Sequence, residues 1–396
     1  MTVIPAFDVT EQFQTLEPEI NRAVAAVLAS GQYINGPAVQ AFAHSFRDYV
    51  GTEHCVACNS GTDALYLALR ALNIGPGDEV ITPSFTFIAT AEVISAVGAT
   101  PVCVDIDLDS FTLDCARLEA ALSDRTRAIM PVHLFGQPAD LGPILDLAQG
   151  YGLAVVEDCA QATGAQWQGQ AVGSIGQVGC FSFYPTKNLG GCGDGGAITT
   201  NDGDLAATMT MLREHGSRLK YHHEAIGVNS RLDSVQAAIL AIKLGHLEGW
   251  NQQRRQIAAT YQQLLSGLEE VVCPQQGGVG QGVWNQYTIR LAGATAGGGQ
   301  RDQVQQLLRQ AGVITAVYYP LPLHLQPVYR HLGYQSGDLP ASETAAHQVL
   351  SLPMFPELRV DQQERVVAEL KTALAQVGLT AAVAQGQLDL SPGVLV

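Results

Sequence analysis

The sequence is poor in charged residues, and basic residues are the scarcer kind. Only 15% of its 396 residues are charged, and 21 lysines and arginines face 37 aspartates and glutamates, which gives a formal net charge of −16. This balance disfavours non-specific binding to nucleic acid or to anionic lipid. It leaves a small anionic substrate open, because a single pocket can still be locally basic.

Long apolar runs and a leader are also missing. No segment approaches the ~18 continuous apolar residues of a membrane span. The first residues, Met1–Pro5, show no basic region followed by an apolar one, so no signal peptide is visible. Hydrophobic residues make up 47% of the chain, enough to bury a large core in two or three domains, or in one large domain and a smaller one. We therefore expect a cytoplasmic globular protein.

The sequence contains no second cysteine or histidine motif that could complete a zinc site with its one Cys-x-x-Cys. The eight cysteines are spread along the chain, and without a signal peptide this spread is typical of reduced thiols. Cys55-x-x-Cys58 could be a redox pair or half of a zinc site, but no second Cys-x-x-Cys and no histidine pair at zinc spacing accompanies it. Since this spacing also fits one strand, we favour a structural role and predict no metal site.

The first half of the chain contains short apolar runs that alternate with helical patterns. The first five runs are spaced by roughly 25 residues, which is typical of repeated strand–helix units and a mostly parallel sheet. The last two are closer together and could pair antiparallel. The predicted strands are Cys55–Cys58, Glu79–Thr82, Val102–Asp105, Ala128–Val132, Leu153–Glu157, Val178–Phe183 and Ala197–Thr200.

The second half begins with a long helical stretch over Ser234–Leu268. Gly245 and Gly249 interrupt it, so we expect either two segments or one bent helix. Glycine-rich runs at 275–278 and 292–299 indicate turns in a smaller C-terminal α+β domain, and the stretch 385–396 has no clear periodicity. In that domain we expect a strand over Val283–Leu291 and helices over Asp302–Ala311 and Gln362–Val377. The predicted division is 1–250, with an N-terminal arm, and 251–396.

A polar turn, Asn59–Asp63, stands between a predicted strand and a predicted helix that runs to Leu72. Free backbone N–H groups and two hydroxyls at a helix start can bind a phosphate. Serine, threonine and aspartate are also good caps, so an ordinary N-cap is the alternative. Taken alone, the turn favours the cap.

Two acids, Glu157 and Asp158, follow the apolar start of the strand at Leu153. The carboxyl edge of an open α/β sheet is where such folds place ligands, although a helix cap by Asp158 is the simpler interpretation. Lys187 follows another strand and precedes Gly190. A lysine desolvated there would have a lowered pKa and could act as a nucleophile, and the alternative is a surface lysine with a buried stem.

Together with the polar loop Gly227–Asp233, these segments strongly resemble the sugar aminotransferases of the DegT/DnrJ/EryC1/StrS family, pyridoxal phosphate enzymes of fold-type I. The resemblance covers about residues 5–375, and the joint occurrence of its motifs in one order is specific. It implies a mostly parallel seven-stranded sheet and a smaller C-terminal domain. The matching stretches are Gly31–Pro37, Ser60–Leu65, Thr82–Phe87, Glu157–Gln161, Ser182–Asn188 and Asn229–Asp233.

The resemblance implies a role for each matched residue. Lys187 would form the Schiff base with pyridoxal phosphate and then shuttle the proton between the amino acid Cα and the cofactor. Asp158 would keep the pyridine nitrogen protonated. Gln161 would hydrogen-bond the 3-hydroxyl, and Phe87 would stack on the ring unless it is a core aromatic.

The resemblance also implies a phosphate site and a dimer. Gly61, Thr62 and Ser182 would hold the cofactor phosphate. Asn229 would reach the phosphate of the neighbouring subunit's cofactor, which requires a homodimer with active sites at the interface.

Substrate contacts are suggested by two further segments. Lys220 and Tyr221 lie in a basic, aromatic cluster that could meet a nucleotide diphosphate, and a solvated loop is the alternative. His324 could contact the sugar nucleotide, and a structural role is the alternative. Tyr318 stands where the family often has histidine.

The resemblance implies transfer of an amino group from L-glutamate to a nucleotide-linked keto sugar. Gly-x-Asn-Ser-Arg-Leu-Asp at 227–233, preceded by His222-His223-Glu224, is similar to members that act on 3-keto sugars. A 4-keto sugar and a non-catalytic or regulatory role on the same fold are the alternatives. A related dehydratase is disfavoured, because those relatives replace the lysine with histidine.

Overall fold

A seven-stranded sheet forms the centre of the computed structural model, which describes residues 3–275, 280–294 and 299–379. The strand order is β1-β9-β8-β5-β4-β2-β3, and β9 pairs antiparallel with both of its neighbours while the other pairs are parallel. The predicted mostly parallel sheet is therefore confirmed, and so is the antiparallel pairing of its last two strands. The strands are β1 (His54–Cys58), β2 (Glu79–Pro83), β3 (Thr100–Val104), β4 (Thr126–Ile129), β5 (Ala154–Asp158), β8 (Val178–Ser182) and β9 (Gly196–Thr200).

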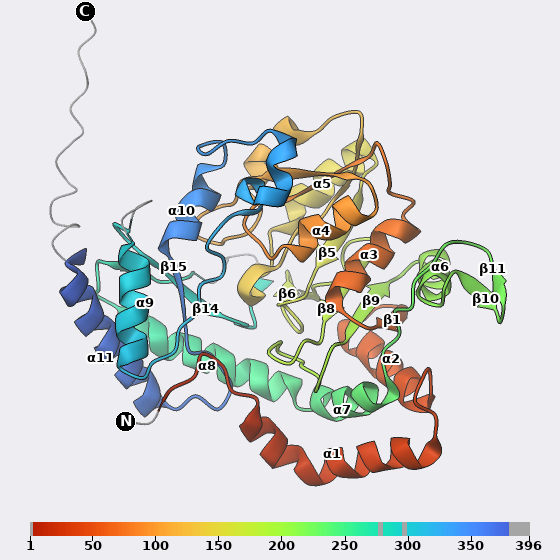
Figure 1. The fold of residues 1–396 in the computed structure, drawn as a ribbon, viewed down its shortest axis with the longest axis horizontal. Helices are drawn as coiled ribbons and strands as arrows, with labels where there is room; N and C mark the ends of the chain where they lie inside the picture. The colour runs from red at the N-terminus through yellow and green to blue at the C-terminus, as the bar shows by residue number, and fades with distance from the viewer. Residues whose placement is uncertain (1–2, 276–279, 295–298, 380–396) are drawn as a thin grey trace, which may run out of the picture.

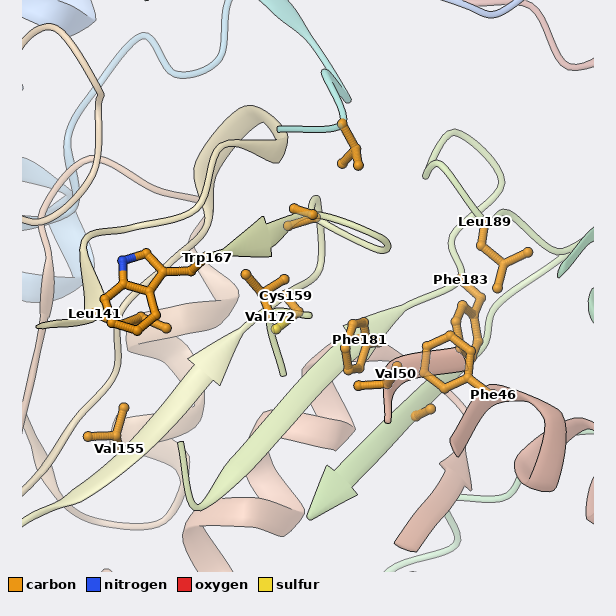
Figure 2. Close-up of a cluster of buried hydrophobic side chains, with 14 of the residues drawn as sticks. Phe46, Val50, Leu141, Val155, Cys159, Trp167, Val172, Phe181, Phe183 and Leu189 are labelled. Carbon is orange, nitrogen blue, oxygen red and sulfur yellow. The ribbon is translucent and has the colours of Figure 1, made fainter. Parts of the chain in front are cut away.

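Helices cover both faces of this sheet, which explains why its strands are apolar almost throughout. Figure 2 shows a buried hydrophobic cluster on one face, in which Phe46 meets Phe181 and Phe183 edge to face at centroid distances of 5.0 and 5.2 Å. One face packs against α2 (Pro37–Val50), α5 (Leu141–Tyr151) and α7 (Ser234–Leu244), and the other against α3 (Gly61–Ala71), α4 (Ala89–Ala96) and α6 (Gly203–Arg213).

The long helical stretch is two helices. The helix α7 ends at Leu244, and α8 (Leu247–Leu265) begins after Gly245 and His246, so the two-segment alternative is confirmed at the first glycine, while Gly249 lies inside α8. The N-terminal helix α1 (Thr10–Ser30) runs beside α7 below the sheet (Figure 1). These helices connect the sheet to the C-terminal part of the chain.

A separate hydrophobic core lies in the C-terminal part. An antiparallel sheet of β12 (Val271–Val272), β14 (Tyr287–Leu291) and β15 (Val349–Leu352) packs against α8, α9 (Gln300–Gln310) and α11 (Val360–Val377). The two predicted helices are confirmed here. Ile4 from the N-terminal segment packs into the same core. The division at residue 250 stays a prediction. Of the expected turns at 275–278 and 292–299, residues 276–278 and 295–298 fall outside the described residues, and so does the stretch 385–396.

The predicted strand over Val283–Leu291 begins four residues late, at Tyr287. Residues 283–286 form a loop because their backbone pairs elsewhere: the N–H groups of Val283 and Gln286 donate to the carbonyls of Gly136 and Phe135. Trp284 has a positive φ of 50°, which a strand cannot contain. An apolar run alone does not reveal such a bend.

The remaining elements are short. They are α10 (Pro340–Gln348), the strands β6 (Gln166–Trp167), β7 (Gln170–Ala171), β10 (Ser217–Leu219), β11 (His222–His223) and β13 (Gly280–Gln281), and the 3₁₀ helices Cys115–Arg117, Glu119–Ala121, Leu134–Gly136, Leu323–Leu325 and Pro327–Leu332.

In the described part of the chain, no helix combines the length and the apolar character needed to cross a bilayer.

Candidate active site

A cavity of about 520 Å³ opens at the carboxyl edge of the central sheet. The ends of β1, β2, β5 and β8 meet there because these strands run in the same direction. The structure thus brings together residues that are far apart in the sequence. Seven predicted site residues line the cavity, namely Gly61, Thr62, Phe87, Asp158, Gln161, Ser182 and Lys187.

The first turn of α3 forms one end of the cavity. Ser60 is the N-cap, and its hydroxyl accepts the Asp63 N–H at 3.0 Å, so the cap interpretation of this turn holds. The first-turn N–H groups of Gly61 and Thr62 have no helical partner and remain available to an anion. A Cβ at Gly61 would lie 2.7 Å from the Ser182 Cβ, so only glycine lets the helix start approach the serine this closely.

The two acids at the end of β5 have separate roles. Asp158 lines the cavity, whereas Glu157 is fully buried and accepts backbone N–H groups from Gly173, Ile175 and Gly176. Burial raises the pKa of Glu157, but the hydrogen bond from His133 at 3.1 Å and those backbone donors more than offset it, so the pKa lies below its usual range. Glu157 therefore fixes the turn behind the strand.

Asp158 is buried but hydrogen-bonded on both oxygens. Thr90 donates its hydroxyl to Oδ2 at 3.0 Å, and the Ala160 N–H donates to Oδ1 at 3.1 Å. Burial raises the pKa of Asp158, while these two donors and the Lys187 ammonium oppose the rise. No helix of the described structure follows β5 at this point, so the bond to Ala160 closes a turn and the helix cap that the sequence allowed is not found; the carboxylate faces the cavity.

Gln161 is held in one orientation. The Phe135 N–H donates to its Oε1 at 2.7 Å, so its amide NH₂ group points to the Tyr319 hydroxyl, 3.2 Å away, and keeps one N–H for a ligand. Phe87 is 53% exposed and its ring lies 6.0 Å from that of Tyr319. In the described structure Phe87 therefore forms a wall of the cavity, which is not the place of a core aromatic.

Lys187 lies in the turn that follows β8. Its backbone N–H donates to the Tyr184 carbonyl at 2.9 Å, and its half-buried side chain lines the cavity. Burial lowers the pKa of Lys187 to about 8, and the nearby Asp158 carboxylate opposes that shift. The neutral amine, which is the nucleophilic form, is therefore accessible near neutral pH.

Three predicted residues lie away from the cavity of their own chain. Lys220 and Tyr221 are in the β10–β11 hairpin, which projects beyond α6 (Figure 1). Tyr221 is 81% exposed, with the Lys220 Nζ 5.1 Å from its ring centroid. Asn229 is exposed and pairs through its backbone with Glu214. The structure does not bring these three residues to the site within one chain.

His324 does not line the cavity either. The residue is 1% exposed, and its ring has Nδ1 2.6 Å from the Ser84 hydroxyl and Nε2 3.2 Å from the Glu343 Oε1. Both ring nitrogens are used inside the chain, and this geometry favours the structural alternative. Its contact with a sugar nucleotide stays a prediction without support from the described residues.

Comparison with known proteins identifies the fold and its chemistry. The sequence profile of the DegT/DnrJ/EryC1/StrS aminotransferase family matches residues 14–371. The chain belongs to this family. It is 48% identical over 369 residues to the pleiotropic regulatory protein of Geobacillus stearothermophilus, covering 93% of this chain and 97% of that one. It is 46% identical over 373 residues to UDP-N-acetyl-3-dehydro-alpha-D-glucosamine 3-aminotransferase of Acidithiobacillus ferrooxidans, covering 94% and 98%.

A solved structure agrees with this assignment. The crystal structure of S. venezuelae DesV in complex with a ketimine intermediate superposes with a TM-score of 0.90 at 45% identity, covering 94% of this chain and 99% of that one. The predicted family, fold class, aminotransferase activity and dependence on pyridoxal phosphate are confirmed.

The donor set of this aminotransferase fits pyridoxal phosphate. The cofactor has an anionic phosphate, a basic ring nitrogen, a phenolic oxygen and an aldehyde. The cavity offers the α3 N-terminus beside Ser182, the Asp158 carboxylate, the free Gln161 amide N–H and the Lys187 amine. Each group on the cofactor thus has a chemically matched partner in the chain.

Two residues that bind predicted site residues were not themselves predicted. Thr90, which is buried behind the cavity and binds Asp158, is the second residue of α4 and lies three residues after Phe87, so helical spacing could have pointed to it. Tyr319, which binds Gln161, lies 158 residues further along the chain, and no local pattern connects the two. The Cys55–Cys58 pair proved to lie on β1, as the structural interpretation expected, and burial raises the pKa of Cys55 to about 12.

Proposed function

We propose that this aminotransferase moves an amino group from L-glutamate to the 3-keto group of a nucleotide-linked sugar. One observation carries the proposal: a single cavity combines an amine of lowered pKa, a buried carboxylate and a helix N-terminus beside a serine hydroxyl. The motifs at 222–233 and the name of the A. ferrooxidans relative support a 3-keto sugar.

The residues of the chain divide the work. Bound pyridoxal phosphate supplies an electron sink for the pair left when an amino acid loses its Cα proton. Lys187 would be the attachment point of the cofactor, and its released Nζ would carry that proton. Asp158 would hold the proton on the ring nitrogen. Gln161 would donate to the ring oxygen, and Phe87 would pack against the ring face.

The phosphate is held at the other end of the cavity. Gly61 and Thr62 present backbone N–H groups, and the α3 dipole favours an anion there. The Ser182 hydroxyl accepts the Tyr184 N–H at 3.3 Å, so its own proton is free to donate to the phosphate. These contacts are independent of Lys187 and Asp158.

A regulatory function is the second candidate, favoured by the name of the G. stearothermophilus relative. Retention of Lys187 and Asp158 in one cavity favours catalysis, because a protein that only needs the fold has no use for a desolvated lysine. A 4-keto sugar also remains an alternative substrate.

The experiment incubates the holoenzyme with L-glutamate and a panel of 3-keto and 4-keto nucleotide sugars, followed by mass spectrometry. We expect an amino sugar nucleotide and 2-oxoglutarate in equal amounts with a 3-keto substrate. Product only from 4-keto sugars would move the reaction to C4. Cofactor binding without turnover of any substrate would favour the regulatory function.

Two copies of the chain complete each active site in this proposal. The cofactor phosphate, the sugar diphosphate and glutamate are all anionic, yet among the described residues that line the cavity Lys187 is the one basic side chain. Lys220, Tyr221 and Asn229 lie outside it, on an exposed hairpin and the loop that follows. A partner subunit that places this segment over the cavity would supply the missing donors.

A cytoplasmic location of the protein stays a prediction.

The shared site predicts complementation between two impaired variants, Lys187→Ala and Asn229→Ala. A mixed dimer would hold one site with both lesions and one with neither. In a symmetric dimer at equal mixing, activity should recover to about a quarter of the wild-type value. The measurement is the transamination rate before and after subunit exchange, with the exchange followed independently by native mass spectrometry.

The control is the cofactor affinity of Asn229→Ala alone, which must be clearly reduced. If both residues served the same chain's site, every site of the mixed dimer would carry one lesion. Absence of recovery despite demonstrated exchange would then reject the shared site and leave the 229–233 loop as helix-capping structure.

A further inference from the structure

A loop from the C-terminal part of the chain connects the two sides of the cavity. Residues 283–286, here the anchor loop, lie between β13 and β14. On one side the Val283 N–H donates to the Gly136 carbonyl at 2.9 Å, next to Phe135, whose N–H orients Gln161. On the other side the loop reaches the residues before and after Lys187.

The contact on the lysine side is a chain of three buried amides. The Asn285 Nδ2 donates to the Asn188 Oδ1 at 2.8 Å and to the Thr186 carbonyl at 3.4 Å. The Asn188 Nδ2 donates to the Asn251 Oδ1 at 2.7 Å and to the Val283 carbonyl at 2.9 Å. Both neighbours of Lys187 are therefore bound by side chains that come from elsewhere in the sequence.

The amide chain ends close to Gln161. The Asn251 Nδ2, on α8, donates to the Thr163 carbonyl at 3.1 Å. Each of the three amides is at least 95% buried, and each donates to the next or to a carbonyl, so their orientations are mutually determined. The chain thus joins the backbone around Lys187 to the backbone two residues beyond Gln161.

A buried arginine also donates hydrogen bonds to the backbone of the anchor loop. Arg254, one turn after Asn251 on α8, donates through Nη1 to the carbonyls of Trp284 and Asn285 at 3.2 and 3.3 Å. Trp284 has a positive φ, so the loop keeps a strained bend at this point. The α8 helix therefore binds the loop directly through Arg254 and is connected to it through Asn251 and Asn188.

We propose that Asn285, with Asn188 and Asn251, is a positioning network that sets where the Lys187 amine stands in the cavity. The inference rests on the proposed function of Lys187. None of the three amides lines the cavity, so they act through the lysine and not on the substrate. The network is directional, and a carboxylate in place of any amide would set oxygen against oxygen.

The experiment measures the amine itself, without turnover. The sequence holds four lysines, Lys187, Lys220, Lys243 and Lys371. The cofactor-free protein is treated with pyridoxal 5′-phosphate and sodium borohydride. The lysine nitrogen adds to the aldehyde, water leaves, and hydride reduces the C=N bond to a stable secondary amine. Peptide mass spectrometry then gives the ratio of labelling at Lys187 to labelling at Lys371, an exposed lysine on α11 that serves as internal reference.

We expect the Lys187 to Lys371 ratio to fall about tenfold in Asn285→Asp, because a misplaced reacting group loses rate steeply. Asn285→Ser should show a similar loss. The serine carries no charge and is too short to hold both acceptors, so a loss shared by both variants excludes a purely electrostatic effect. Asn201→Asp is the matched control: this exposed residue accepts the Glu53 N–H through Oδ1, which aspartate can also do.

The possible outcomes are distinct. A ratio unchanged in both Asn285 variants, even with a lowered melting temperature, would overturn the positioning role and leave a merely structural network. Equal losses in Asn201→Asp would overturn it as well. A wild-type protein that fails to label at Lys187 while Lys371 reacts would instead contradict the proposed function, whatever the variants do.

Discussion

Lys187→Ala should abolish transamination while the fold persists. The variant would lose both the proposed attachment point and the proposed proton carrier, so we expect a rate loss beyond about 10⁴-fold, the upper end of what one general acid–base group contributes. The visible absorption of the lysine-bound cofactor should disappear. The measurement is amino sugar formation by mass spectrometry together with the absorption spectrum of the purified protein.

A measurement of thermal stability distinguishes this loss of activity from misfolding of the variant. Burial lowers the pKa of Lys187 from 10.5 to about 8, so at pH 7 the folded state holds a protonated amine less favourably than the unfolded state. Between about pH 8 and 10.5 the folded state loses this proton first, and its stability rises. Cofactor-free Lys187→Ala should therefore melt no lower than the wild type at pH 7. Lys371→Ala is the matched control, and near-normal turnover in Lys187→Ala would refute the assignment.

Asp158→Asn should slow the chemical step far more than it weakens cofactor binding. An amide cannot hold the ring nitrogen protonated, and removing one such electrostatic contact costs about 10²–10³-fold. The local geometry should survive, because the amide oxygen can still accept the Ala160 N–H and the Thr90 hydroxyl can turn to accept an amide proton. Single-turnover conversion with glutamate measures the step.

Asp158→Asn should also lower the pKa of Lys187. Because the Asp158 carboxylate raises the pKa of Lys187, its removal should move the pH midpoint of borohydride trapping below about 8. Cofactor should be retained through the α3 N-terminus and Ser182. Asp202→Asn, which keeps the cap of α6, is the control. An unchanged single-turnover rate would show that Asp158 has only a structural role in its turn.

The strands of the central sheet were predictable because a short stretch of sequence specifies each of them. Strands buried on both faces read as continuous apolar runs, and all seven predicted strands exist with small shifts, such as β4, which begins at Thr126 instead of Ala128. The residues of the cavity were predictable through their motifs. Each motif follows a strand end, and parallel strands bring those ends to one edge.

The anchor loop could not be predicted in this way. The apolar and aromatic residues Val283 and Trp284 favour a strand, but hydrogen bonds to the carbonyls of Phe135 and Gly136 and from the side chains of Asn188 and Arg254 hold the backbone in a loop. The amide that holds the Lys187 turn comes from a residue 97 positions away. No periodicity in a short window carries information about a partner at that distance.

The sequence by itself determined the strand–helix alternation, the family and the types of chemical group that the site would hold, because these depend on short segments whose composition is enough to specify them. The tertiary structure alone decided which of two adjacent acids faces the cavity and that His324 is bonded to Ser84 and Glu343. It also decided that two distant amides, Asn251 and Asn285, bond Asn188 in the turn that holds Lys187. The physical reason is that a buried polar group must find a partner wherever the packed chain offers one, and packing is settled only when the whole chain has folded.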